Sequence, residues 1–174
     1  LITGASGGVG LNAVATAAAL GLVPVAVVSD EAKADPVRAA EAATVLIRPT
    51  LKEVRAAAAE LGRARGVDTA LEITGAPTFE LSLRSLRPGG CLVLVGNVDP
   101  EREISLPAGL TILRELRVNG SAHATRADLE EVVALVESGR LTPLENVVYP
   151  LAEVAKVHAQ LDARTLVGRA VLVP

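Results

Sequence analysis

The stretch "LITGASGGVG", residues 1–10, decides the fold, because a glycine-rich turn follows a short apolar run and leads into a helical pattern. Residues 5–10 fill the frame G-x-G-x-x-G, with Ala5 in place of the first glycine. In this frame Gly7 allows the backbone to approach a pyrophosphate, and Gly10 allows the helix to pack closely against the strand. The amides at the start of the helix then point at the anion.

The turn favours a dinucleotide site over a plain tight turn, because four glycines fall within seven residues between an expected strand and an expected helix. The tripeptide G-K-[ST], which marks nucleoside triphosphate loops, does not follow it. We therefore expect these residues of the turn to bind the cofactor: Ala5, Ser6, Gly7, Gly8, Val9 and Gly10.

Short apolar runs alternate with longer helical stretches along the chain. We expect strands at Leu1–Thr3, Pro24–Ser29, Thr44–Ile47, Thr69–Thr74, Cys91–Gly96 and Arg117–Ser121. We expect helices at Val9–Leu20, Ala34–Ala43, Leu51–Leu61, Pro77–Leu86 and Asp128–Ser138. Asp35 is the expected N-cap of the second helix, and Thr50 with Glu53 forms a capping box for the third. This alternation predicts the α/β class, a doubly wound parallel sheet of Rossmann type.

The pattern changes after Thr142 and Pro143, where a strand at Val147–Tyr149, a helix at Leu151–Leu161 and a strand at Gly168–Val173 follow. We therefore divide the chain into a dinucleotide-binding domain over residues 1–142 and a C-terminal strand-helix-strand unit over residues 143–174.

Composition excludes several classes of partner. The net charge is −3 and the only aromatic residues are Phe79 and Tyr149, so neither a basic footprint nor a stacking platform for nucleic acid is present. No apolar run reaches the ~20 residues of a membrane span, and no signal peptide pattern opens the sequence. Cys91, His123 and His158 lack metal-ligand spacing, so we expect no metal site. These features predict a cytoplasmic protein without disulfides.

Two enzyme families use a turn of this kind. Read as T-G-x-x-x-G-x-G, it resembles that of the short-chain dehydrogenases, whose tyrosine and lysine lie on one helix as Y-x-x-x-K. In this sequence Tyr149 is followed by Pro150, and Glu153 stands where the lysine would be. The short-chain interpretation therefore fails on the residues that its chemistry needs.

Five segments together resemble the medium-chain dehydrogenase/reductases, most of all the zinc-independent quinone oxidoreductase and acryloyl-CoA-reductase-like branch. They are Gly4–Gly10, Val25–Ser29, "LEITGAPTFELSLRSLRPGGCLVLVGN" (71–97), "LRELRVNGSAHATRADLEEVVALVESGRL" (113–141) and the end from "PLAEVAKVHAQL" to "LVGRAVLVP" (150–174). The resemblance implies hydride transfer from a nicotinamide cofactor to an activated alkene or a quinone-like acceptor. A non-catalytic nucleotide-binding or sensing module is the alternative.

The resemblance also implies a GroES-like substrate domain ahead of the cofactor domain, which carries most catalytic and substrate contacts. Nothing precedes Leu1 in this sequence, so we expect that domain to be missing from it, and we name no catalytic residue. Residues 143–174 would return to that missing domain. Residues 1–174 alone are expected to turn over little.

The residues after the second strand bear on whether the cofactor is NADP(H) or NAD(H). The position after the second strand falls on Val28 or Ser29, neither of which is acidic, and Ser29 with Lys33 matches the serine and lysine of NADPH-using relatives. Asp30 and Glu31 count against this, but NADP(H) is preferred over NAD(H).

At the carboxyl ends of the later strands we expect contacts to the ribose and nicotinamide from Thr74, Gly96, Asn97, Val98 and Ser121. Gly75 and Gly120 follow strands too, but ordinary strand-to-loop turns explain them nearly as well. The edge strand, residues 117–121, pairs subunits in many relatives, which predicts a homodimer. Asp68 and Glu72 bracket a strand. Paired carboxylates for glycoside chemistry would need a cleft, which the sequence does not indicate here.

Overall fold

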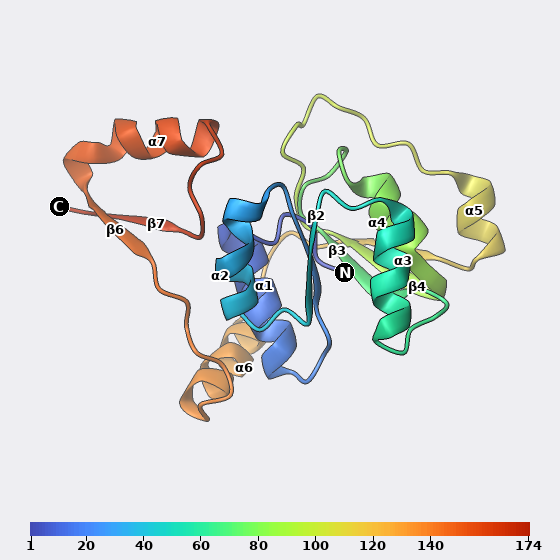
Figure 1. Cartoon of the computed structure of the whole chain (residues 1–174). Helices are drawn as coiled ribbons and strands as arrows, with labels where there is room; N and C mark the ends of the chain where they lie inside the picture. Colours follow the sequence, from blue (N-terminus) through green and yellow to red (C-terminus); the bar gives the residue numbers. More distant parts are fainter.

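The computed structural model describes residues 1–174 and contains one central parallel sheet (Figure 1). Its named strands are β1 (Val25–Val28), β2 (Thr44–Ile47), β3 (Val67–Glu72), β4 (Leu86–Leu94) and β5 (Arg117–Gly120). β1 pairs with β2, β3 with β4 and β4 with β5, all in parallel.

The amino-terminal residues join these strands into one sheet. Ile2 bridges Ala26 on one side and Leu71 on the other. The amide of Ile2 donates to the carbonyl of Val25 at 2.9 Å, and the amide of Thr3 donates to that of Leu71 at 3.1 Å. The order is therefore β2, β1, residues 1–5, β3, β4, β5, and the predicted doubly wound sheet is confirmed. The glycine turn leaves this sheet from its middle, where the strand order reverses.

Helices cover both faces of the sheet (Figure 1). They are α1 (Gly8–Ala19), α2 (Ala34–Ala39), α3 (Leu51–Glu60), α4 (Phe79–Ser85), α5 (Ala108–Leu113) and α6 (Arg126–Glu137). Alternate residues of β1 face opposite cores: Val25 and Val27 pack with the α3 and α4 side, whereas Ala26 and Val28 pack with α1 and α2. All four are buried, as expected for a strand that is covered on both faces.

The ends of several elements shift by a few residues: α2 ends at Ala39 instead of Ala43, and β3 spans Val67–Glu72 instead of Thr69–Thr74. Three further features differ from the sequence predictions. The N-cap assignment of Asp35 is wrong, because a 3-10 turn at Glu31–Lys33 precedes α2 and Asp30 caps that turn by accepting from the amide of Ala32 at 3.0 Å. The short helix α5 was not predicted, because its 6 residues are too few to show a helical periodicity. β4 begins at Leu86 instead of Cys91, because its pairing with β3 shifts register across the segment that holds Pro88.

The C-terminal unit forms its own small sheet beside the central one (Figure 1). In it β6 (Val147–Pro150) pairs in parallel with β7 (Ala170–Val173), and α7 (Val154–Asp162) connects them after a 3-10 turn at Leu151–Glu153. This unit meets the main body at the glycine turn, where the amide of Gly168 donates to the carbonyl of Ser6 at 3.1 Å. None of the helices combines the length and apolarity that a membrane crossing requires.

Candidate functional site

The glycine turn presents the free amides of α1 at the carboxyl edge of the sheet. Gly7 is the N-cap of α1, no side chain caps the helix, and its first turn contains no acidic residue. The amide of Leu11 is the one that donates to the carbonyl of Gly7, at 2.9 Å, so the amides ahead of it have no partner within the helix. Such an end attracts an anion through both its donors and the helix dipole.

Gly7 and Gly10 differ in the space around them. A Cβ on Gly10 would lie 2.2 Å from the carbonyl oxygen of Gly4 and 2.6 Å from Cα of Ala5, so only glycine fits where α1 crosses the strand. A Cβ on Gly7 would meet nothing closer than 3.5 Å, and Gly7 is exposed. The turn is thus closed toward the sheet and open toward solvent, as a backbone that receives a ligand must be.

The loops after β3 and β4 meet beside this turn. The amide of Val98 donates to the carbonyl of Thr74 at 3.1 Å. A Cβ on Gly75 would lie 2.3 Å from Oδ1 of Asn97, and one on Gly4 would lie 3.1 Å from Oγ1 of Thr74. The structure therefore brings Thr74, Gly75 and Asn97 together with the start of the glycine turn.

Gly96 and Ser121 complete the same edge. A Cβ on Gly96 would lie 2.5 Å from the carbonyl oxygen of Ile73, so this position also tolerates only glycine. The amide of Ser121 donates to the carbonyl of Leu94 at 2.9 Å, which places Ser121 at the end of β5 beside the end of β4. His123, which follows it, is exposed.

Ser29 lies between two cations at the end of β1. Nζ of Lys33 donates to Oγ of Ser29 at 3.1 Å and lies 3.8 Å from the carboxylate of Asp30. Arg48 follows β2, and its Nε donates to the backbone carbonyl of Ser29. Sequence reasoning missed Arg48, although its place directly after the strand that neighbours β1 was a usable signal.

The acidic residues near Ser29 have other partners. The carboxylate of Glu31 pairs with Arg38 at 3.1 Å, and that of Asp35 pairs with the same guanidinium at 2.7 Å. The hydrogen bonds that the guanidinium donates to Glu31 first and to Asp35 second raise the pKa of Arg38. Asp30 is engaged with the amide of Ala32. The local negative charge that counts against a bound phosphate is therefore partly neutralised.

Arg169 is a second cation that the sequence did not single out. A Cβ on Gly8 would lie 3.2 Å from the carbonyl oxygen of Gly168 and 3.4 Å from Nε of Arg169. The exposed Arg169 therefore lies against the first turn of α1, next to the unpaired amides. Its only sequence signal is that it belongs to the glycine-arginine pair directly ahead of β7.

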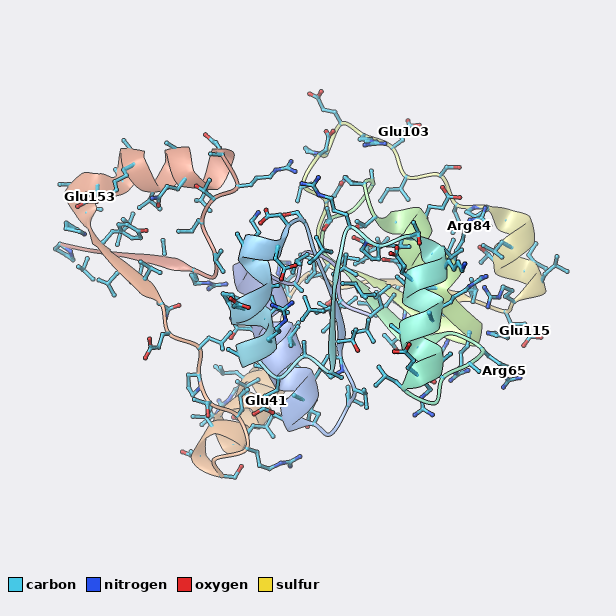
Figure 2. The ribbon with its side chains drawn as sticks, viewed as in Figure 1. Glu41, Arg65, Arg84, Glu103, Glu115 and Glu153 are labelled. Atoms are coloured by element: carbon cyan, nitrogen blue, oxygen red, sulfur yellow. The ribbon has the colours of Figure 1, made fainter.

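Tyr149 and Glu153 lie away from this edge. Tyr149 belongs to β6, and its hydroxyl donates to Oε1 of Gln160 at 3.1 Å. Glu153 lies at the outer end of the C-terminal unit (Figure 2) and pairs with Lys156 at 2.6 Å. Tyr149 is in a strand ahead of a helix, as predicted from Pro150.

A buried carboxylate lies beneath the candidate site. Glu72, at the end of β3, is fully buried. It accepts hydrogen bonds from Thr3 ahead of the glycine turn, from the loop after β3 and from α4. Asp68 lies toward the other end of β3, partly exposed, where its hydrogen bond with Arg87 lowers its pKa. The two carboxylates therefore do not share a site.

A family model described as zinc-binding dehydrogenase matches residues 8–138. The acryloyl-coenzyme A reductase of Metallosphaera sedula is 35% identical over 172 residues, which are 99% of this chain and 49% of that protein. The quinone oxidoreductase of Pseudomonas aeruginosa is 31% identical over 188 residues, covering all of this chain and 56% of that protein. The chain thus spans about half the length of these curated relatives.

Solved structures show the same fold. The structure of the 2-octenoyl-CoA carboxylase reductase CinF, in complex with NADP and 2-octenoyl-CoA, matches with a TM-score of 0.84 and 29% identity. The match covers 99% of this chain and 42% of that one.

The zinc in the family description does not fit the residues of this chain. No group of three or more His, Cys, Asp or Glu side chains is placed to hold a metal ion. Cys91 is buried in β4 and accepts from Nδ2 of Asn119 at 3.6 Å, whereas His123 and His158 are exposed on separate elements. No step of the chemistry is therefore assigned to zinc.

Proposed function

Since this chain belongs to the zinc-binding dehydrogenase family within the medium-chain dehydrogenase/reductases, we propose that it is the NADP(H)-binding half of an oxidoreductase that reduces an activated alkene. The observation that carries the proposal is the uncapped start of α1 at the middle of the parallel sheet, where Gly7 leaves the backbone open to an anion.

The pyrophosphate would lie on the turn formed by Ala5, Ser6 and Gly7 and on the first amides of α1, those of Gly8 and Val9. Its two negative charges also need a cation. The position of Arg169 against Gly8 supports this residue as that cation. The C-terminal strand would then contribute to the cofactor site as well as to its own small sheet.

The 2′-phosphate of NADP(H) would lie at Ser29, between Lys33 and Arg48. Lys33 at the hydroxyl of Ser29 and Arg48 at its backbone carbonyl support a phosphate monoester there more than they support a free ribose. In CinF, NADP is the cofactor of the solved complex. We infer the same preference for this chain.

The bound cofactor would supply the hydride, and the residues of this chain would position it. Thr74, Asn97 and Val98 lie together beside the turn, which supports them as contacts of the nicotinamide ribose and amide. Gly96 and Ser121 lie at the same edge and would complete this end of the site.

The proposed acceptor is an α,β-unsaturated thioester. The relative from Metallosphaera sedula is named for acryloyl-coenzyme A, and the CinF complex holds 2-octenoyl-CoA. A quinone-like acceptor is the other candidate, since the relative from Pseudomonas aeruginosa is named a quinone oxidoreductase. The contacts with this substrate would come from the half of the relatives' length that this chain does not span, against which residues 143–174 would pack.

The edge strand β5 is the proposed contact between two copies. β4 is its only partner in the sheet, so its other side offers unpaired backbone donors and acceptors.

Calorimetric titration with NADPH and NADH tests the cofactor proposal. We expect NADPH to bind more tightly than NADH. Arg48→Ala should weaken NADPH about tenfold, the loss of one charge-assisted contact, and change NADH by less than about twofold. Arg84→Ala is the matched control, because Arg84 lies in the last turn of α4 with its guanidinium paired with Glu80, and it should leave both affinities unchanged.

Failure of the unmodified chain to bind either nucleotide would contradict the cofactor assignment. Equal affinities for the two nucleotides, with no effect of Arg48→Ala, would contradict only the preference for NADP(H).

A further inference from the structure

Glu72 is a fully buried carboxylate that makes none of the proposed contacts with the cofactor. It ends β3, the strand next to the amino-terminal residues in the centre of the sheet. A buried carboxylate is costly unless hydrogen bonds satisfy its oxygens. The identity of its donors therefore indicates what it does.

Four donors converge on one oxygen of this carboxylate. Oε1 accepts from Oγ1 of Thr3 at 2.7 Å, from the amide of Thr74 at 3.0 Å, from the amide of Gly75 at 2.9 Å and from Oγ1 of Thr78 at 2.7 Å. Oε2 accepts from Oγ of Ser82 in α4. A carboxylate oxygen has two lone pairs, so the four donors around Oε1 share them.

These donors belong to both ends of the candidate site. Thr3 directly precedes Gly4, where the glycine turn begins, and its hydroxyl also accepts from the amide of Ile73 at 3.1 Å. Thr74 and Gly75 form the loop that contacts Asn97. One carboxylate thus ties the turn that would hold the pyrophosphate to the loop that would hold the nicotinamide end.

We propose that Glu72 is a positioning residue, which holds the glycine turn and the Thr74–Gly75 loop in the one relative placement that receives both ends of the dinucleotide. The inference rests on the proposed function. Glu72 touches neither reacting atoms nor cofactor; it acts through the hydroxyl of Thr3 and two backbone amides.

Glu72→Gln tests the inference, because it keeps the shape but replaces one accepting oxygen by a donating amide. NADPH spans both loops, whereas adenosine 2′-monophosphate, which lacks the 5′-phosphate, would reach only the site around Ser29. We expect Glu72→Gln to weaken NADPH about tenfold or more, as accepted hydrogen bonds are lost, and to change adenosine 2′-monophosphate by less than about twofold. The amide NMR signals of Thr74 and Gly75 should move in the unliganded variant.

Ser82→Ala is the matched control. It removes the single bond to Oε2 and leaves all four bonds to Oε1, so NADPH affinity should stay within about threefold of the unmodified chain. If Glu72→Gln does not fold, Thr3→Val takes its place. This variant keeps the side-chain shape and breaks the link to the turn, and it should weaken NADPH but not adenosine 2′-monophosphate.

Three outcomes would overturn the inference. Unchanged NADPH affinity in Glu72→Gln and Thr3→Val would show that the link is dispensable. An equal loss for NADPH and adenosine 2′-monophosphate would show that Glu72 acts only on overall folding. Binding of neither ligand by the unmodified chain would overturn the proposed function as well, whereas the first two outcomes leave it intact.

Discussion

Gly7 and Gly10 belong to one turn, yet each is glycine for its own reason. Gly10 is buried against the backbone of Gly4 and Ala5, so its role is to let α1 approach the strand. Gly7 is exposed and has room for a methyl group in the absence of a ligand. The first is required by packing, and the second becomes necessary only when an anion approaches the backbone.

Alanine at these two positions should separate stability from binding. Gly10→Ala forces a 2.2 Å approach to the carbonyl of Gly4, and we expect it to lower the free energy of unfolding by about 3 kcal/mol. Gly7→Ala should change that free energy by less than about 0.5 kcal/mol, yet weaken NADPH about tenfold. Urea unfolding and calorimetric titration measure the two effects.

The opposite pattern would contradict this account of the turn. If Gly10→Ala were as stable as the unmodified chain, α1 would not be held at the distance that the structure gives. If Gly7→Ala bound NADPH normally, the ligand would not lie against this part of the backbone.

At the scale of elements, the start of α3 is fixed by a capping box that the sequence predicted. The hydroxyl of Thr50 accepts from the amide of Glu53 at 3.4 Å, and the carboxylate of Glu53 accepts from the amide of Thr50 at 2.7 Å. The same arrangement joins Thr125 and Asp128 at the start of α6. α3 buries Val54, Ala57 and Ala58, whereas α6 buries only Leu135.

Thr50→Ala should lower the free energy of unfolding by about 1 kcal/mol, because an amide of the first turn loses its acceptor. Thr125→Ala is the comparison: the same cap is lost from a helix with little buried surface, so the cooperative unfolding transition should move less. Urea unfolding followed by circular dichroism measures both. If both variants shifted the unfolding transition equally, the effect of a lost cap would not depend on how much surface its helix buries.

The capping box also predicts a pH dependence. The amide of Thr50 first, and its hydroxyl second, lower the pKa of Glu53 below its ordinary value. A carboxylate with a lowered folded-state pKa stabilises the fold above its unfolded pKa of ~4.3, and loses that contribution as the pH falls through the folded value. Glu53→Gln should therefore be less stable than the unmodified chain at pH 7, and the difference should fade in acid.

At the scale of the whole molecule, β5 leaves one edge of the central sheet open. Its pairing with β4 continues to the amide of Ser121, which donates to Leu94. Because backbone amides alternate in direction along a strand, the amide of Gly120 points away from β4. Open space surrounds the Cβ position of Gly120, so a side chain there meets no neighbour.

We expect the chain, of 17.8 kDa, to sediment as a dimer. Gly120→Pro removes the outward donor and should give a monomer with an unchanged circular dichroism spectrum. Sedimentation velocity measures the change. Pairing through β5 would be contradicted if the unmodified chain stayed monomeric at all concentrations. It would also be contradicted if the Gly120→Pro variant stayed dimeric.

The sequence by itself determined the parts of the protein that depend on neighbouring residues. Strand and helix alternation follows from local periodicity, and the capping box at Thr50 follows from groups three residues apart. The dinucleotide frame at residues 5–10 is local too, and with four further segments it led to the right superfamily. These features were readable because each is encoded within a few residues of chain.

Only the tertiary structure decided which distant residues meet. It placed Arg48 beside Ser29, Arg169 beside Gly8, and the carboxylate of Glu72 between the turn and the following loop. It also set the start of β4, because that boundary depends on register with β3. Such contacts follow from how the chain packs around its core, and no local pattern of residues carries that information.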